Sequence, residues 1–173
     1  KSFFMNPLVR QYYEQNSHIV LIDTGNSYQG LCELIHRKTK GEDGIYYTYT
    51  EEKPISFNPF FTDDYKFSVE KKDSIKTLLL ALWKGEDEKI TKTESGELGS
   101  AVSAYIRRIQ QNRDIVPSFD TFYEYMLNDY RKELAARDIK VSRKDFNIDN
   151  FLTTLRQYYK GGRYDFLLNS NEN

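Results

Sequence analysis

The sequence of 173 residues is poor in cysteine and histidine and has no long apolar run. Its one cysteine, Cys32, excludes an internal disulfide and is typical of a reducing compartment. The two histidines, His18 and His36, lie in no Cys/His cluster, so we expect no zinc site. No apolar run approaches the roughly 20 residues that a membrane-spanning helix needs. We therefore expect a cytoplasmic globular protein without a transmembrane segment.

An excess of charge of one sign is also lacking, because the formal net charge is −1 although 29% of the residues are charged. The chain as a whole thus has no electrostatic reason to bind nucleic acid. Three basic pairs stand out locally, at residues 107–108, 131–132 and 143–144. We interpret them as solvated faces of helices and expect no direct nucleic-acid binding.

The first third of the chain has the pattern of an α/β fold. The apolar run His18–Asp23 predicts a strand of a sheet covered on both faces. Helices are expected at residues 7–16 and 26–38, and further strands at 44–50 and 55–60. Asn6 and Pro7 suit the N-cap and first position of the first helix, so we predict that this helix begins there and not at Lys1. Asn26 or Ser27 is the expected cap of the second helix.

From Thr62 onward the apolar residues recur with the period of a helix and not with that of a strand. Helices are predicted at residues 69–85, 97–112, 118–138 and 147–162. Ser118 is the expected N-cap of the third of these helices, and Gly161 the expected C-cap of the fourth. Residues 62 to about 161 should therefore pack as a helical subdomain.

Residues at the start of the chain suggest a nucleotide site. In P-loop proteins a glycine-rich loop ends in Gly-Lys-Ser or Gly-Lys-Thr, and the backbone amides of the following helix hold phosphates. Here Lys1-Ser2, a helix and an apolar strand follow one another, and Asp23 ends that strand. The carboxyl ends of strands are where α/β sheets bind ligands. Lys-Ser is only a dipeptide, however, and by itself predicts little.

The segments KSFFMNPLVRQYY, HIVLIDTGNSYQGLCELI and ISFNPF resemble the TraG-type conjugation ATPases of Bacteroides conjugative transposons. That family belongs to the type IV secretion ATPases and is more distantly related to the HerA and FtsK motors. The resemblance is close over residues 1–60, and the remainder, ending YYKGGRYDFLLNSNEN, is similar to the helical insertion of these ATPases. It implies an α/β plus all-α fold. Residues 1–61 would be part of a RecA-like P-loop domain, and residues 62–173 a helical insertion subdomain with an exit segment.

The resemblance also implies roles for single residues. Lys1 and Ser2 match the end of the Walker A motif, where they bind phosphate and hold magnesium, and Asp23 matches an acidic residue at the nucleotide edge. Phe57–Phe60 matches an Asn-Pro turn that closes a strand, although a plain turn with apolar anchors explains it equally well. The implied cofactors are ATP and Mg²⁺. The implied partners are other copies of the ATPase and other secretion components, at the inner face of the cytoplasmic membrane.

The chain departs from the family pattern in ways that limit this expectation. The sequence contains neither the glycines of a Walker A loop nor an apolar strand ending in Asp-Glu, the Walker B motif. Gly25 and Ser27 stand where relatives often carry glutamates. We therefore expect a fragment of a longer ATPase that binds no nucleotide and hydrolyses no ATP alone. The alternatives are a non-catalytic helical interaction module and a fragment of a DNA-translocating motor, which the balanced charge does not support.

Overall fold

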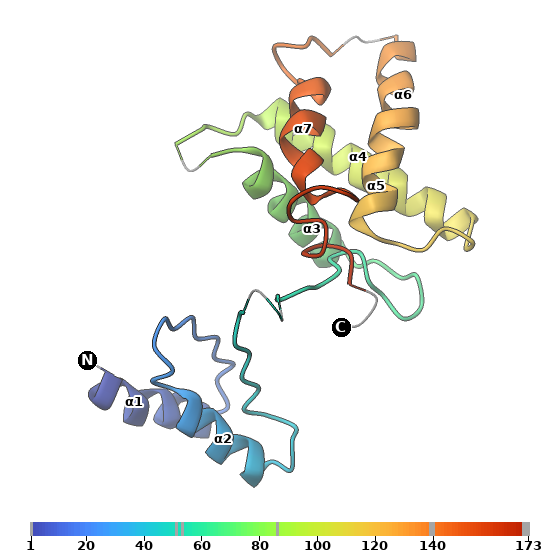
Figure 1. Cartoon of the computed structure of the whole chain (residues 1–173). Helices are drawn as coiled ribbons and strands as arrows, with labels where there is room; N and C mark the ends of the chain where they lie inside the picture. Colours follow the sequence, from blue (N-terminus) through green and yellow to red (C-terminus); the bar gives the residue numbers. More distant parts are fainter. Residues whose placement is uncertain (1, 51, 53, 86, 139–140, 171–173) are drawn as a thin grey trace. The chain divides into compact units, whose positions relative to one another are not determined.

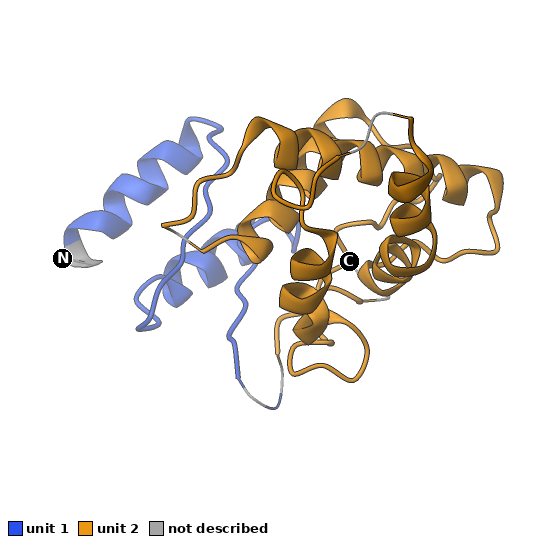
Figure 2. Cartoon of the chain, turned by 90° about the horizontal axis from the view of Figure 1, so that it is seen from above, with its two compact units in different colours: residues 1–53 blue, residues 54–173 orange. Residues whose placement is uncertain are grey.

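The computed structural model describes residues 2–50, 52, 54–85, 87–138 and 141–170, and for residues 2 and 3 the backbone only. The chain divides into two compact units, Lys1–Lys53 (unit 1) and Pro54–Asn173 (unit 2), coloured separately in Figure 2. All regular secondary structure in the described residues is helical (Figure 1). The prediction of an α/β region is therefore wrong, and no RecA-like sheet is evident in these residues.

Unit 1 contains two helices, α1 (Ser2–Glu14) and α2 (Gln29–Lys38). The prediction that the first helix begins at Asn6-Pro7 is wrong, because Pro7 lies inside α1. A proline removes a single backbone donor, and here that loss does not end the helix. The side chain of Asn6 does not act as an N-cap, since its Nδ2 donates to the carbonyl oxygen of Ser27 at 3.1 Å.

The segments predicted as strands in unit 1, residues 18–23 and 44–50, carry no strand. A strand requires a neighbour that completes its ladder of hydrogen bonds, and sequence pattern alone does not provide one. Several apolar side chains of these segments are exposed instead: Val20 is 89% exposed, Ile22 98% and Tyr47 76%. Among the described residues of this unit, Val9 is the one buried hydrophobic side chain. Unit 1 thus has little hydrophobic core of its own.

The start of α2 also differs from the prediction. Its N-cap is Tyr28, without a side-chain cap, and neither Asn26 nor Ser27 takes that role. Asn26 has a φ of 53° and its Oδ1 accepts a hydrogen bond from the Tyr46 hydroxyl at 2.8 Å, so its side chain is used elsewhere. After α2, Gly44 adopts a φ of 72°, and a Cβ there would lie 2.3 Å from the carbonyl oxygen of Cys32. The turn after α2 therefore requires glycine.

Unit 2 is built from helices, as its apolar period predicted. They are α3 (Val69–Trp83), α4 (Lys92–Gln111), α5 (Phe119–Tyr125), the π-helix η1 (Met126–Tyr130), α6 (Arg131–Ala136), α7 (Ile148–Leu155) and the 3₁₀-helix η2 (Arg156–Tyr158). No strand occurs among the described residues of 62–161, so the helical character predicted for this part of the chain is confirmed, and the compact unit that contains it begins at Pro54.

The helix ends in unit 2 test the predicted caps. Ser118 is confirmed, because its hydroxyl accepts from the backbone of Thr121 in a capping box at the start of α5. The predicted C-cap at Gly161 is wrong: α7 ends at Leu155, η2 follows, and Gly161 lies beyond both in a turn with a φ of 75°. A second capping box, Thr91 with Glu94, starts α4 earlier than the apolar pattern indicated.

An aromatic core holds unit 2 together. Phe60 is fully buried, with its ring centroid 5.4 Å from that of Tyr105 and 5.2 Å from that of Phe122. Asn58 is also buried; its Oδ1 accepts from the Phe60 N–H at 2.9 Å and its Nδ2 donates to the Pro117 carbonyl at 2.8 Å. The FNPF motif is thus a turn in which the Phe60 ring packs into the core and the Asn58 side chain links the turn to Pro117. The strand predicted at residues 55–60 is wrong.

Candidate functional site

Asp23, the acidic residue that the sequence analysis singled out, organises a tight turn in unit 1. Its Oδ2 accepts the backbone N–H of Ser27 at 2.6 Å, and its Oδ1 accepts that of Gly25 at 3.3 Å. An aspartate that accepts the amides of its own turn is a common way of stabilising such a loop. The side chain is nevertheless exposed, so the carboxylate keeps access to solvent.

Two neutral side chains hold this turn from other parts of unit 1. Asn6, in α1, donates to the carbonyl oxygen of Ser27, and the Tyr46 hydroxyl donates to Asn26. Because Asn6 lies four positions after Ser2 in the same helix, the N-terminal half of α1 is tied to the Asp23 turn. The carbonyl oxygen Asn6 Oδ1 is buried and has no hydrogen-bond partner among the residues that the structure describes.

The other two predicted site residues are Lys1 and Ser2. Lys1 lies outside the described residues, and Ser2 is the first residue of α1 but its side chain is not described. The start of a helix of this length presents free backbone N–H groups that suit an anion. In unit 1 the hydrogen bond from Asn6 thus links α1, about one turn after its first residue, to the Asp23 turn.

The described residues fit ATP and Mg²⁺ only in part. The oxygens of Asp23 are engaged by backbone amides, and Asn6 and Tyr46, which hold the turn, carry no positive charge for a phosphate. Within the part of the chain that the structure describes, no group of three or more His, Cys, Asp or Glu side chains could hold a metal ion. These residues do not complete a nucleotide site, and we derive no chemical step from them.

A cavity of about 190 Å³ in unit 1 is lined by residues of both helices and of the loops beside them, among them Tyr13, Cys32 and Asp43. The Tyr13 hydroxyl donates to the Asp43 carboxylate at 2.6 Å, and this hydrogen bond raises the pKa of Tyr13. Burial raises the pKa of the Cys32 thiol. A thiol with a raised pKa remains protonated and is a poor nucleophile, so this cavity has no evident catalytic chemistry.

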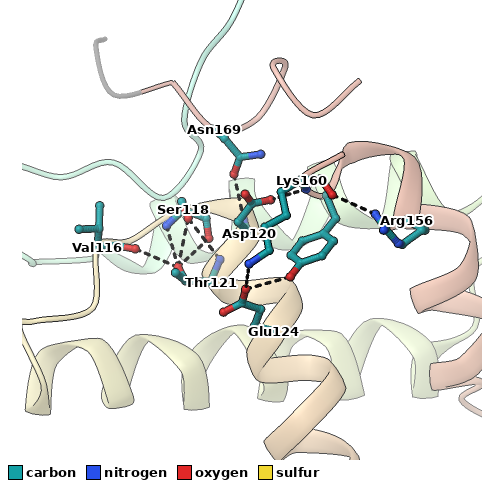
Figure 3. Close-up of polar contacts among 9 residues, drawn as sticks. Val116, Ser118, Asp120, Thr121, Glu124, Arg156, Lys160 and Asn169 are labelled. Atoms are coloured by element: carbon teal, nitrogen blue, oxygen red, sulfur yellow. Dashed lines mark hydrogen bonds and ion pairs between the residues drawn. The ribbon is translucent and has the colours of Figure 1, made fainter. Parts of the chain in front are cut away.

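In unit 2 a polar cluster joins the start of α5 to the chain after η2, as Figure 3 shows. Glu124 accepts from the ammonium group of Lys160 at 2.5 Å and from the Tyr159 hydroxyl at 2.9 Å, and these bonds lower the pKa of Glu124. Asp120 accepts from the Lys160 backbone at 3.0 Å, while its own N–H donates to Asn169 Oδ1 at 2.9 Å. Burial raises the pKa of Asp120. Every contact in this cluster joins one part of unit 2 to another, so we interpret it as structural.

A second cluster, which could not be predicted from the sequence, surrounds Tyr130 at the end of the π-helix, where α6 begins. The hydroxyl of Tyr130 donates to Glu97 Oε2 at 3.0 Å and accepts from Arg137 Nη2 at 3.0 Å, and Arg137 Nη1 donates to Glu97 Oε2 at 2.7 Å. Tyr130 is buried, and this burial raises its pKa. No local signal in the sequence links these three residues, which come from two helices and the residue after α6.

Comparison with known proteins identifies the family. Searches of curated proteins and of solved structures gave no match. No helix in the described part of the chain is both long and apolar enough to cross a membrane. A family model described as the TraG P-loop domain matches residues 1–173, which is the whole sequence. The chain therefore belongs to the TraG P-loop domain family.

Proposed function

We propose that the chain is a segment of an ATPase that drives conjugative transfer through a type IV secretion apparatus, and that unit 1 forms one side of its nucleotide site. The observation that carries the proposal is the family match over the whole sequence. The hydrogen bond from Asn6 to Ser27 supports it, because this bond ties the helix that begins at Ser2 to the Asp23 turn.

In this proposal Lys1 binds the terminal phosphates of ATP and the Ser2 hydroxyl is a ligand for Mg²⁺. The metal would offset negative charge on the phosphates. Asp23 would stabilise the turn that runs to Ser27 by accepting its backbone amides. The glycine-rich loop and the Walker B carboxylate would come from residues outside these 173. We further propose that the ATPase assembles with copies of itself and with other secretion components at the inner face of the cytoplasmic membrane.

The test compares this chain with the complete gene product. The 173-residue chain alone should release no phosphate from MgATP. In the complete protein, Lys1→Ala should abolish hydrolysis and conjugative transfer without changing the melting temperature, whereas Lys38→Ala, at an exposed position in the last turn of α2, should leave both intact. Normal hydrolysis and transfer in the Lys1→Ala protein would show that Lys1-Ser2 is an ordinary dipeptide.

A second role, for unit 2, is favoured by its separate core. Its buried residues come from unit 2 alone, and one member of each of the three basic pairs engages a carboxylate of the same unit: Arg108 pairs with Asp129, and Asp149 with both Arg131 and Arg143. We propose that unit 2 is a docking module for other components of the apparatus. A DNA-translocating role gains no support from basic residues that are already paired.

A further inference from the structure

A positively charged groove of about 520 Å³ lies between α3 and α4, the neighbouring green and yellow-green helices of Figure 1. Lys72 and Lys76 line it from α3, and Arg107 lines it from α4. Asp73 lies 2.8 Å from Lys76 and offsets one of these three charges. Neither Lys72 nor Arg107 forms an ion pair with any residue that the structure describes. The groove therefore has two uncompensated positive charges.

The floor of the groove is formed by small residues of α4. Gly96, Gly99, Ser100 and Ser103 line it over successive helical turns. Gly96 has no positive φ, and a Cβ added there would meet nothing within 4 Å. Glycine inside a helix costs about 1 kcal/mol of stability relative to alanine. Neither the backbone conformation nor the packing of this chain requires glycine at position 96. The absence of a side chain there therefore serves to keep the groove open.

We propose that this groove binds an acidic helix of a partner protein. The small residues from Gly96 to Ser103 allow another helix to approach α4 closely over about two turns. Lys72 and Lys76 are one turn apart, which matches carboxylates four positions apart on the partner. The groove has no aromatic side chain among its lining residues on which a base could stack, so single-stranded nucleic acid is disfavoured.

This inference rests on the docking role proposed for unit 2 and specifies the chemistry of its partner. Charge complementarity of this kind selects the partner and its orientation and speeds its association. Nucleotide takes no part in the contact, so its test is independent of ATP hydrolysis.

The experiment measures binding of fluorescent peptides to the intact chain without nucleotide. The probe is an alanine-based helical peptide of about 20 residues, about 30 Å long, with glutamates four positions apart. A matched peptide carries glutamine instead. We expect the glutamate peptide to bind at least about tenfold more tightly than the glutamine peptide at low salt, and its advantage to shrink as salt is added.

Variants of the chain locate the site. Arg107→Glu should weaken binding of the glutamate peptide about tenfold, whereas Lys144→Glu, the same charge change at an exposed position outside the groove, should weaken it less than about twofold. Gly96→Phe should block the groove, and because the space there is open the variant should keep the helical circular dichroism of the parent. If Gly96→Phe fails to fold, Arg107→Glu and the salt dependence still decide the question.

Several outcomes would overturn the proposal. The first is no binding of the glutamate peptide, and the second is binding that neither groove variant weakens. The third is tighter binding of a single-stranded oligonucleotide or of inorganic phosphate at the same residues. The fourth is self-association of the chain that the groove variants abolish, which would make a second copy the occupant. Loss of ATPase activity in the complete protein, with peptide binding intact, would affect only the nucleotide proposal.

Discussion

The ammonium nitrogen of Lys84, the residue after α3, lies 2.7 Å from Oε1 of Glu94 in the first turn of α4, and both side chains are largely buried. Glu94 also accepts from the Thr91 N–H at 2.8 Å, so one carboxylate closes the capping box of α4 and the ion pair with α3. Burial would raise the pKa of Glu94, but the hydrogen bonds from Lys84 and Thr91 outweigh it and lower that pKa below its ordinary value of 4.5.

Glu94→Gln should therefore destabilise unit 2 by about 1–2 kcal/mol at pH 7, through loss of the charged cap and of the pair with Lys84. A carboxylate with a lowered folded-state pKa stabilises the protein above its unfolded pKa, and this contribution disappears as the pH falls through the folded pKa. Urea unfolding should thus show a wild-type advantage at pH 7 that shrinks below pH 4.5. Glu88→Gln, which removes a more exposed carboxylate 3.8 Å from Lys84, is the control and should have little effect. An advantage of the same size at every pH would contradict the assignment.

Asn58 joins the FNPF turn to the loop before α5, and it is buried. Asn58→Ala should lower the free energy of unfolding by about 1–3 kcal/mol, because the Phe60 N–H and the Pro117 carbonyl would lose their partner. Thermal unfolding followed by circular dichroism measures the change. Asn128→Ala, at an exposed position of the π-helix, is the matched control. Equal stability of the two variants would show that water replaces the two hydrogen bonds of the Asn58 side chain.

Much of unit 2 was predictable because its helices bury apolar stripes that recur along the sequence. The strand prediction for His18–Asp23 failed for a physical reason: a run such as Ile19–Ile22 suits a strand, but pairing depends on residues distant in the sequence. A local hydrogen bond was predictable too, as the Ser118 cap shows. Asn26 was misassigned because its side chain bonds to Tyr46, a contact that no local pattern specifies.

Asp23 could be singled out from the sequence as a candidate site residue, whereas the groove between α3 and α4 could not. Gly96 and Gly99 reduce the helical propensity of α4, so propensity alone treats them as weak points. Their spacing with Ser103 is visible in the sequence, and so is that of Lys72 with Lys76. What no pattern specifies is that α3 and α4 place these two sets on opposite sides of one groove.

The glycines at positions 44 and 30 should respond in opposite ways to alanine. Gly44→Ala should disrupt the turn after α2, because a Cβ there would lie 2.3 Å from a backbone oxygen and the φ of 72° is strained for alanine. Gly30→Ala, in the first turn of α2, would meet nothing within 4 Å and should raise helix stability by up to about 1 kcal/mol. Amide NMR spectra of the two proteins measure the difference. Unchanged signals around Asp43 in the Gly44→Ala protein would refute the description of this turn.

The last prediction separates two roles of Asp23. If its carboxylate serves the turn, a side chain that still accepts the Ser27 N–H should preserve it, and both Asn and Ser can do so. Asp23→Ala should then accelerate hydrogen exchange of the Ser27 amide about tenfold. Asp23→Asn and Asp23→Ser should accelerate it far less, and Glu42→Ala, at an exposed acidic position in unit 1, should leave it unchanged.

In the complete protein the same Asp23 variants test whether the negative charge of Asp23 contributes to ATP hydrolysis. We expect ATP hydrolysis to follow the order of turn protection, because both carboxylate oxygens are engaged by the amides of Gly25 and Ser27. Hydrolysis lost equally in all three Asp23 variants, with the turn protected in two of them, would instead assign Asp23 a direct role in the chemistry.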